Sequence, residues 1–123
     1  MKKFTIYHNP RCRKSREALK FLEEKGFTGE VIHYIEYPFT KESLQKVLNK
    51  IDLQPSAIVR KNETQWKDIP NRSVLSEDET LDFLVKFPKL IERPIVVIGD
   101  KGVLARPLEN LTLFLKSYET LTT

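Results

Sequence analysis

The first 35 residues alternate between strand and helix patterns, and this alternation constrains the fold most strongly. Residues 3–7 alternate apolar and polar side chains and end at the turn signal His8-Asn9-Pro10. Residues 14–25 lack proline and glycine, place apolar side chains at helical spacing and precede Gly26, a typical helix stop. Residues 30–35 are rich in β-branched and aromatic side chains. This order predicts two parallel strands joined by a right-handed helical crossover.

The middle of the chain predicts helices. Thr40 is a candidate N-cap, and four apolar side chains follow it at the spacing of one helix face: Leu44, Val47, Leu48 and Ile51. Ser76 begins a capping box with Glu79, ahead of a second apolar stripe. We expect these helices to form an insertion at about residues 38–90.

The C-terminal part returns to strands. Residues 95–98 form a continuous β-branched run, residues 99–102 predict a tight hairpin connection, and residues 103–106 predict the partner strand. Pro107 suits the first turn of a closing helix. The expected fold is α/β: a small mixed sheet with flanking helices, and the helical insertion between the βαβ and ββα halves. We expect one domain over residues 1–123.

The composition is that of an ordinary globular chain, with 40% hydrophobic and 31% charged residues. No apolar run approaches the roughly 20 residues that a membrane helix needs, and the N-terminus lacks the pattern of a signal peptide. We therefore expect a cytoplasmic protein with no membrane partner. The net charge of +4 favours anions of any size and identifies none of them.

Cys12 is the only cysteine, and it lies just ahead of the predicted first helix. Unpaired N–H groups and the helix dipole stabilise a thiolate at such a position. Four cations lie within four residues of it and should lower the pKa of the thiol further: Arg11, Arg13, Lys14 and Arg16. Ser15 is a candidate hydrogen-bond donor to the thiolate. We hypothesise a reactive thiolate near neutral pH, the alternative being a cysteine packed as a small hydrophobe.

The remaining cysteine, histidine and aromatic content argues against a disulfide, a metal site and a nucleic-acid-binding surface. A single cysteine cannot form an intramolecular disulfide, so any redox cycle needs an external thiol. One cysteine and two histidines, with no acidic cluster at ligand spacing, predict no metal site. His33 lies within an apolar strand and suits a core or edge position. Four aromatic residues are scattered over different elements and predict packing, with no nucleic-acid partner: Tyr34, Tyr37, Phe39 and Trp66.

The stretch Tyr7-His8-Asn9-Pro10-Arg11-Cys12-Arg13-Lys14-Ser15-Arg16 resembles the active-site loop of ArsC-type arsenate reductases. These are the glutaredoxin-coupled class, and their relatives include the Spx transcriptional regulators. Three more stretches are similar to the family's other motifs: Val59 to Asn62, Ile91 to Val97 and Leu104 to Pro107. The likeness runs from residue 4 to about residue 115. It implies a thioredoxin-like (glutaredoxin-like) domain.

The resemblance also implies a site. Cys12 would attack the arsenic of bound arsenate, and three arginines would hold the anion: Arg60, Arg93 and Arg106. Guanidinium groups supply planar, permanently charged donors that suit a tetrahedral oxyanion, although a lone arginine is usually solvated surface charge. Pro94 would be a cis-proline facing the cysteine. His8, Ser15 and Arg16 would support the thiolate or order the loop, and purely structural roles suit His8 and Arg16 equally well.

The implied reaction is reduction of arsenate to arsenite with no bound cofactor, and the small size of the chain favours a monomer. Cys12 would attack, glutathione would add to the arsenic as co-substrate, and glutaredoxin would reduce the adduct. One alternative is a glutathione-linked thiol oxidoreductase of the same fold with a different substrate, because this loop is more basic than the small-residue loop typical of the reductases. The other is an Spx-like regulator that binds RNA polymerase. Such regulators commonly carry Cys-x-x-Cys, and Ser15 occupies the second position here.

Overall fold

The computed structural model describes residues 3–122, with side chains described as far as residue 117, and it contains two compact units. Unit 1 combines Met1–His33 with Arg93–Thr123, and unit 2 is Tyr34–Glu92. The helical insertion expected at about residues 38–90 falls within unit 2. A single domain over both units stays a prediction, and its residues 1, 2 and 123 lie outside the described part of the chain.

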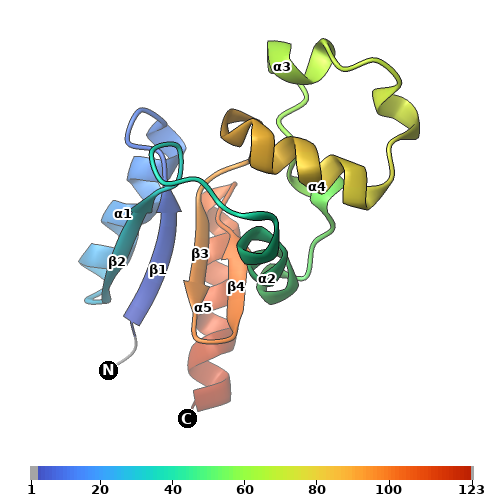
Figure 1. Cartoon of the computed structure of the whole chain (residues 1–123). Helices are drawn as coiled ribbons and strands as arrows, with labels where there is room; N and C mark the ends of the chain where they lie inside the picture. Colours follow the sequence, from blue (N-terminus) through green and yellow to red (C-terminus); the bar gives the residue numbers. More distant parts are fainter. Residues whose placement is uncertain (1–2, 123) are drawn as a thin grey trace. The chain divides into compact units, whose positions relative to one another are not determined.

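Unit 1 is built on a four-stranded mixed sheet with the order β2-β1-β3-β4 (Figure 1). The strands are β1 (Lys3–His8), β2 (Thr28–His33), β3 (Ile95–Ile98) and β4 (Lys101–Leu104). β1 pairs in parallel with β2 and antiparallel with β3, and β3 and β4 form an antiparallel hairpin. The predicted parallel pair, hairpin and mixed sheet are therefore confirmed.

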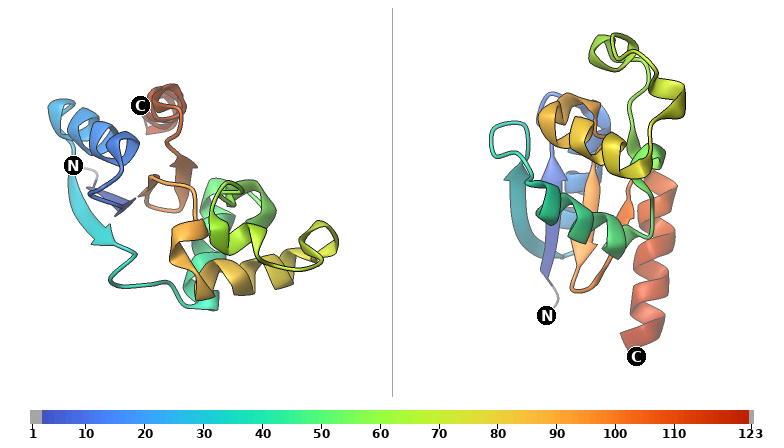
Figure 2. Two further views of the ribbon diagram at one scale, coloured as in Figure 1. Left: turned by 90° about the horizontal axis from the view of Figure 1, so that it is seen from above. Right: turned by 45° about the vertical axis from the view of Figure 1, so that its right-hand side comes forward.

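Helices α1 (Arg13–Glu24) and α5 (Leu108–Thr122) cover the same face of this sheet (Figures 1 and 2). α1 has no internal proline or glycine, and its chain direction reverses through Gly26, whose φ is +85°. The two helices and the strands enclose one apolar core of buried residues: Phe4, Ile6, Ala18, Leu22, Val96, Ile98, Ala105, Leu111 and Leu115. Burial of this surface holds unit 1 together and fixes the start of α1 over the end of β1.

Two strands are shifted from their expected positions. β2 begins at Thr28 and ends at His33, because its ladder with β1 ends where β1 ends, at the pair His8 and His33. β4 begins at Lys101, because a two-residue turn with Gly99 at φ +65° closes the hairpin. Pro107 was expected in the first turn of the closing helix, but it directly precedes α5. The bond Arg93–Pro94 is cis, as the resemblance implied, and Arg106–Pro107 is cis as well.

Unit 2 contains the two predicted helices, α2 (Lys41–Ile51) and α4 (Glu77–Lys86). Thr40 and Ser76 each form a complete capping box, which confirms both predicted N-caps. Shorter elements that the sequence pattern did not indicate lie between and after them: η1 (Pro55–Ile58), α3 (Thr64–Lys67), η2 (Arg72–Val74) and η3 (Pro88–Leu90). Tyr34, Phe39 and Trp66 are buried as expected, whereas Tyr37 is 72% exposed because it lies in the turn before α2.

Within the described part of the chain, no helix is long and apolar enough to cross a membrane.

Candidate active site

Cys12 is the N-cap residue of α1, with an extended backbone at φ −93° and ψ 121°. Its N–H donates to the carbonyl oxygen of Asn9 at 2.9 Å, and its own carbonyl oxygen accepts the N–H of Arg16 at 3.1 Å. The loop after β1 is thereby closed into a tight turn that leads directly into the helix. The thiol is half-buried and lies among the first N–H groups of α1, which have no partner within the helix.

The pKa of the Cys12 thiol is lowered from its ordinary value. Burial alone would raise this pKa, but hydrogen bonds from the backbone N–H groups of Ser15 and Lys14, and the hydrogen bond and charge of Arg93, outweigh the effect of burial. The prediction of a lowered thiol pKa is confirmed in direction. The expected contribution of the backbone N–H groups at the start of α1 is confirmed, whereas the charge that lowers the pKa comes from Arg93 and not from the four neighbouring cations.

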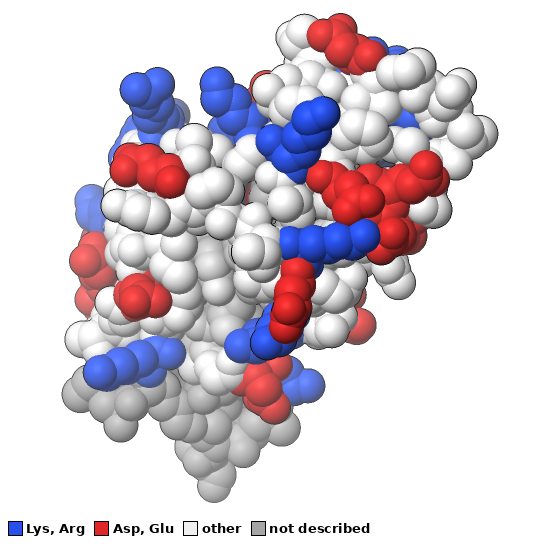
Figure 3. Space-filling model, viewed as in Figure 1, with Lys and Arg blue, Asp and Glu red and all other residues white. Residues whose placement is uncertain are grey.

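The side chains of those cations are exposed, and two of them bind other groups. Arg13 is paired with Glu17 at 3.1 Å, and its side chain is 84% exposed. Arg16 donates from Nη1 to the carbonyl oxygen of Pro10 at 2.9 Å, and Arg11 and Lys14 are exposed. Figure 3 shows Lys and Arg side chains in this region, over the loop that connects β1 and α1. In water these charges are screened, so they contribute to the local field and not to a defined contact with sulfur.

Ser15 supports the thiol differently from the expectation. Its backbone N–H is the group that hydrogen-bonds to Cys12. Its hydroxyl is fully buried and lies 2.7 Å from Nδ1 of His8, and it accepts the N–H of Asn9 at 3.1 Å. His8 is also buried, at the end of β1. Thus the buried side chains of Ser15 and His8 stabilise the loop, while the backbone N–H of Ser15 contacts the sulfur.

Arg93 and Arg106 reach Cys12 from the other half of unit 1. Nη1 of Arg106 lies 3.7 Å from Sγ of Cys12 and 3.5 Å from the carbonyl oxygen of Arg93. The N–H of Ala105 donates to the carbonyl oxygen of Pro94 at 2.9 Å, which ties the segment before β3 to the segment after β4. The two arginines are therefore held side by side at the same end of the sheet as the cysteine.

Pro94 and Asn110 complete the support of this end of the sheet. Pro94 is buried and follows Arg93 directly. The side-chain amide of Asn110, in the first turn of α5, donates to the carbonyl oxygens of Arg106 at 3.1 Å and of Leu104 at 3.3 Å. Asn110 was not singled out from the sequence. The sequence around Asn110 gives no indication of this role, because a hydrogen bond from a side chain to the backbone depends on the path of the chain after β4.

Arg60 lies in unit 2. Its N–H donates to the carbonyl oxygen of Leu90 at 2.7 Å, and Nε lies 3.4 Å from Oε1 of Glu63. Its side chain is 22% exposed, so Arg60 is not a freely solvated arginine. Its place in an anion site with Cys12 stays a prediction.

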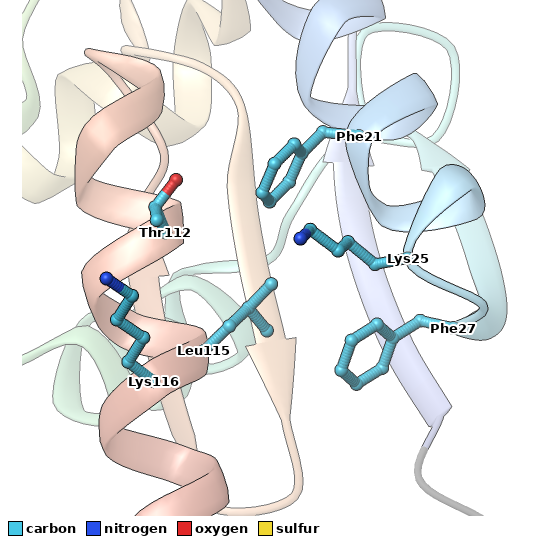
Figure 4. Close-up of a pocket in the computed structure, with 6 residues that line it drawn as sticks. All are labelled: Phe21, Lys25, Phe27, Thr112, Leu115 and Lys116. Carbon is cyan, nitrogen blue, oxygen red and sulfur yellow. The ribbon is translucent and has the colours of Figure 1, made fainter.

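Other candidate sites on unit 1 involve different residues. A groove of about 170 Å³ between α1 and α5 is lined by two phenylalanines, two lysines, Thr112 and Leu115, and includes no residue of the Cys12 loop (Figure 4). No three metal-ligating side chains gather into one group among the described residues. The chemically distinctive place on unit 1 is accordingly the end of the sheet where Cys12, Arg93 and Arg106 meet.

This arrangement can hold an anion against a nucleophile. The thiolate supplies the nucleophile, two guanidinium groups supply charged donors, and the start of α1 supplies backbone N–H groups. The four-stranded mixed sheet with its flanking helices, and a reactive cysteine at a helix N-terminus, define a thioredoxin-like thiol protein.

Comparison with known proteins identifies the family. The chain belongs to the ArsC family, whose model matches residues 7–114. It is 38% identical to an arsenate reductase from Neisseria meningitidis in an alignment of length 116 that covers 90% of this chain and 97% of that protein. It is 36% identical to an arsenate reductase from Escherichia coli, over 89% of this chain and 78% of that protein.

A solved structure gives the same result. The arsenate reductase from Vibrio cholerae superposes with a TM-score of 0.84 at 37% identity, covering 90% of this chain and 97% of that one. The predicted thioredoxin-like fold and the resemblance to the ArsC family are therefore confirmed.

Proposed function

We propose that this protein reduces arsenate to arsenite, with Cys12 as the nucleophile and external thiols as the reductant. The observation that carries the proposal is the approach of the Arg106 guanidinium to the Cys12 sulfur, at 3.7 Å, beside a second arginine that hydrogen-bonds to the same sulfur. Relatives that are named arsenate reductases, at 36–38% identity over most of the chain, support the substrate class.

The first step is a substitution at arsenic. The thiolate of Cys12 attacks the arsenic atom of arsenate, a sulfur–arsenic bond forms, and one oxygen leaves as water after protonation. Arg93 and Arg106 hold the remaining oxygens and balance their charge, because guanidinium groups make paired, charge-assisted hydrogen bonds to oxyanions. Arg60 would add a third guanidinium group. Arsenic stays in its +5 state through this step, so no reductant is consumed.

The second stage supplies two electrons from outside the chain. Glutathione adds its sulfur to the arsenic and releases a second water molecule. A further thiol, provided by glutaredoxin, attacks the glutathione sulfur, so that a disulfide forms and arsenic is reduced to the +3 state. Hydrolysis then releases arsenite and restores the Cys12 thiol. The net reaction converts arsenate and two thiols into arsenite, a disulfide and water. The single cysteine of the sequence supports this dependence on external thiols.

A coupled assay tests the proposal. NADPH consumption is followed with arsenate, glutathione, glutathione reductase and glutaredoxin, for the wild type and for Cys12→Ser. We expect turnover in the wild type, none in Cys12→Ser, and none when either glutathione or glutaredoxin is left out. Arg13→Gln, which removes an exposed charge one residue from the nucleophile, serves as the matched control and should keep most of the activity. Absence of turnover in the wild type, with a known arsenate reductase active in parallel, would refute the proposal.

A second candidate is a glutathione-linked thiol oxidoreductase acting on a substrate other than arsenate. The exposed cations Arg11 and Lys14 beside Cys12 favour it, since they offer charge to a larger anionic thiol or disulfide than an inorganic oxyanion. Reduction of the mixed disulfide of glutathione and hydroxyethanethiol separates the two candidates. This second candidate predicts turnover of that disulfide that does not require arsenate.

A further inference from the structure

His33 is the last residue of β2, and it contacts a buried residue of the candidate active site. In the parallel ladder it is the register partner of His8, which ends β1. The two rings meet edge to face, with centroids 5.7 Å apart and an interplanar angle of 77°. This is the favourable arrangement for a pair of flat rings, because the edge of one meets the face of the other. His33 itself is half-buried, on the edge strand of the sheet.

His8 in turn is bonded to the residue that contacts the nucleophile. Nδ1 of His8 lies 2.7 Å from Oγ of Ser15, and both side chains are buried. The backbone N–H of Ser15 hydrogen-bonds to the sulfur of Cys12. A continuous series of contacts thus runs from His33 through His8 and Ser15 to the thiolate.

The hydroxyl of Ser15 joins the His8 ring to the backbone of the loop. The N–H of Asn9 donates to Oγ of Ser15 at 3.1 Å, so the oxygen accepts there, and the hydroxyl hydrogen is available to donate to Nδ1 of His8. The same oxygen has a second lone pair that can accept from Nδ1, so the hydrogen bond holds the His8 ring against Ser15 in either neutral tautomer. Burial, the charge of His33 and the charge of Arg16 all lower the pKa of His8, which is consistent with a neutral ring.

We propose that His33 is a positioning residue for Cys12: its ring holds the His8 imidazole in the orientation that hydrogen-bonds to the Ser15 hydroxyl, and thereby keeps the Ser15 N–H directed at the thiolate. The catalytic importance of this contact rests on the proposed function, whereas its effect on the thiol does not. Without the His33 ring beside it, the His8 ring can rotate, Ser15 loses its fixed hydrogen-bond partner, and the first turn of α1 relaxes around Cys12. The thiolate is then less stabilised.

The pH dependence of Cys12 alkylation by iodoacetamide tests the proposal without any arsenate. In His33→Ala the profile should shift to higher pH, with a rate at about pH 6 that is about threefold lower, as expected for partial loss of one hydrogen bond to a charged group. In His33→Phe, which keeps a flat ring against His8, the profile should stay close to that of the wild type. Ser15→Ala removes the hydroxyl that links His8 to the Cys12 loop. In that background, His33→Ala should cause no further shift.

Controls separate positioning from mere stability. Val31→Ala truncates a half-exposed side chain two residues earlier on the same strand, and it should change the unfolding transition without changing the alkylation profile. An unshifted profile in His33→Ala, or a shift in His33→Phe as large as in His33→Ala, would overturn the proposal. Because the readout is the thiol itself, either outcome is independent of whether arsenate is the substrate. If His33→Ala shows the expected shift but the wild type does not turn over arsenate, only the proposed function is contradicted.

Discussion

Nη1 of Arg106 lies 3.7 Å from Sγ of Cys12, although the two residues are 94 positions apart in the chain. Cys12 begins α1 and Arg106 follows β4, so neither is near the other until β1 pairs with β3 and β3 pairs with β4. The contact therefore depends on the whole sheet of unit 1. It places a permanent positive charge with several donors directly against the nucleophile, which is where the oxygens of a bound anion would lie.

Arg106→Lys should separate charge from geometry. Lysine keeps the positive charge beside Cys12 but cannot form the paired hydrogen bonds of a guanidinium group. We expect the KM for arsenate to rise about tenfold, which corresponds to loss of one hydrogen bond to a charged group, while kcat falls less. Steady-state kinetics in the coupled assay measure both constants. An unchanged KM would remove Arg106 from the anion site.

Arg93→Gln should raise the pKa of the Cys12 thiol, because Arg93 contributes both a hydrogen bond and a charge that lower it. The rate of alkylation by a thiol reagent, followed from about pH 5 to pH 10, gives this pKa. The matched control is Arg11→Gln, which removes a charge that is adjacent in sequence but exposed. Equal shifts in the two variants would contradict the view that Arg93, and not the loop cations, stabilises the thiolate.

The lowered thiol pKa should also make folding stability depend on pH. A thiol is neutral when protonated, so a folded-state pKa below the unfolded one means that the unfolded state binds more protons between the two values. The stabilisation is fully present above the pKa of the unfolded thiol and is lost as the pH falls through the folded-state pKa. The free energy of unfolding of the wild type relative to Cys12→Ser should therefore increase from about pH 6 to pH 9. Urea denaturation measures it, and a difference independent of pH would count against the assignment.

Gly29→Ala should be strongly destabilising for a steric reason. Gly29 is the register partner of Phe4 in the parallel ladder, and an added Cβ would overlap the carbonyl oxygen and the ring of Phe4. Phe4 is 3% exposed and cannot yield without disturbing the core, so we expect a loss of about 2 to 3 kcal/mol.

Gly26→Ala is the comparison for this variant, and urea denaturation measures both. Gly26 has a φ of +85° with open space around it, so alanine there costs only about 1 kcal/mol of backbone strain. Equal losses in the two variants would show that the close approach of Phe4 and Gly29 is unimportant.

Arg60→Ala tests the third predicted anion ligand. If Arg60 binds arsenate, its removal should weaken arsenate binding about tenfold, and the pKa of Cys12 should stay unchanged. Lys61→Ala removes an exposed charge from the neighbouring position and is the matched control. Competition of arsenate with alkylation of Cys12 measures the affinity of both variants without turnover. Equal affinities in Arg60→Ala and in Lys61→Ala would exclude Arg60 from the site.

Local patterns predicted most elements of the fold correctly. The capping boxes at Thr40 and Ser76 mark two helix starts, because a cap is formed by residues only three positions apart. The glycine after α1 and the hairpin glycine at position 99 are local signals of the same kind. The ends of β2 and β4 were misplaced, since strand ends depend on the length of the partner strand and on the turn that closes the pair.

The candidate site also combines features that follow from local sequence with features that depend on tertiary contacts. The sequence by itself determined that one cysteine begins the first helix, that its thiol pKa is lowered there and that no second thiol can close a redox cycle, because these follow from residue type and from contacts along a single turn. Only the tertiary structure decided which charged side chains stabilise the thiolate. The four neighbouring cations are exposed and their charges are screened by water, and Arg13 and Arg16 bind other groups, whereas Arg93 and Arg106 are brought to the sulfur from the C-terminal part of the chain by the sheet. Charge acts on the sulfur according to distance and burial, and separation along the sequence measures neither.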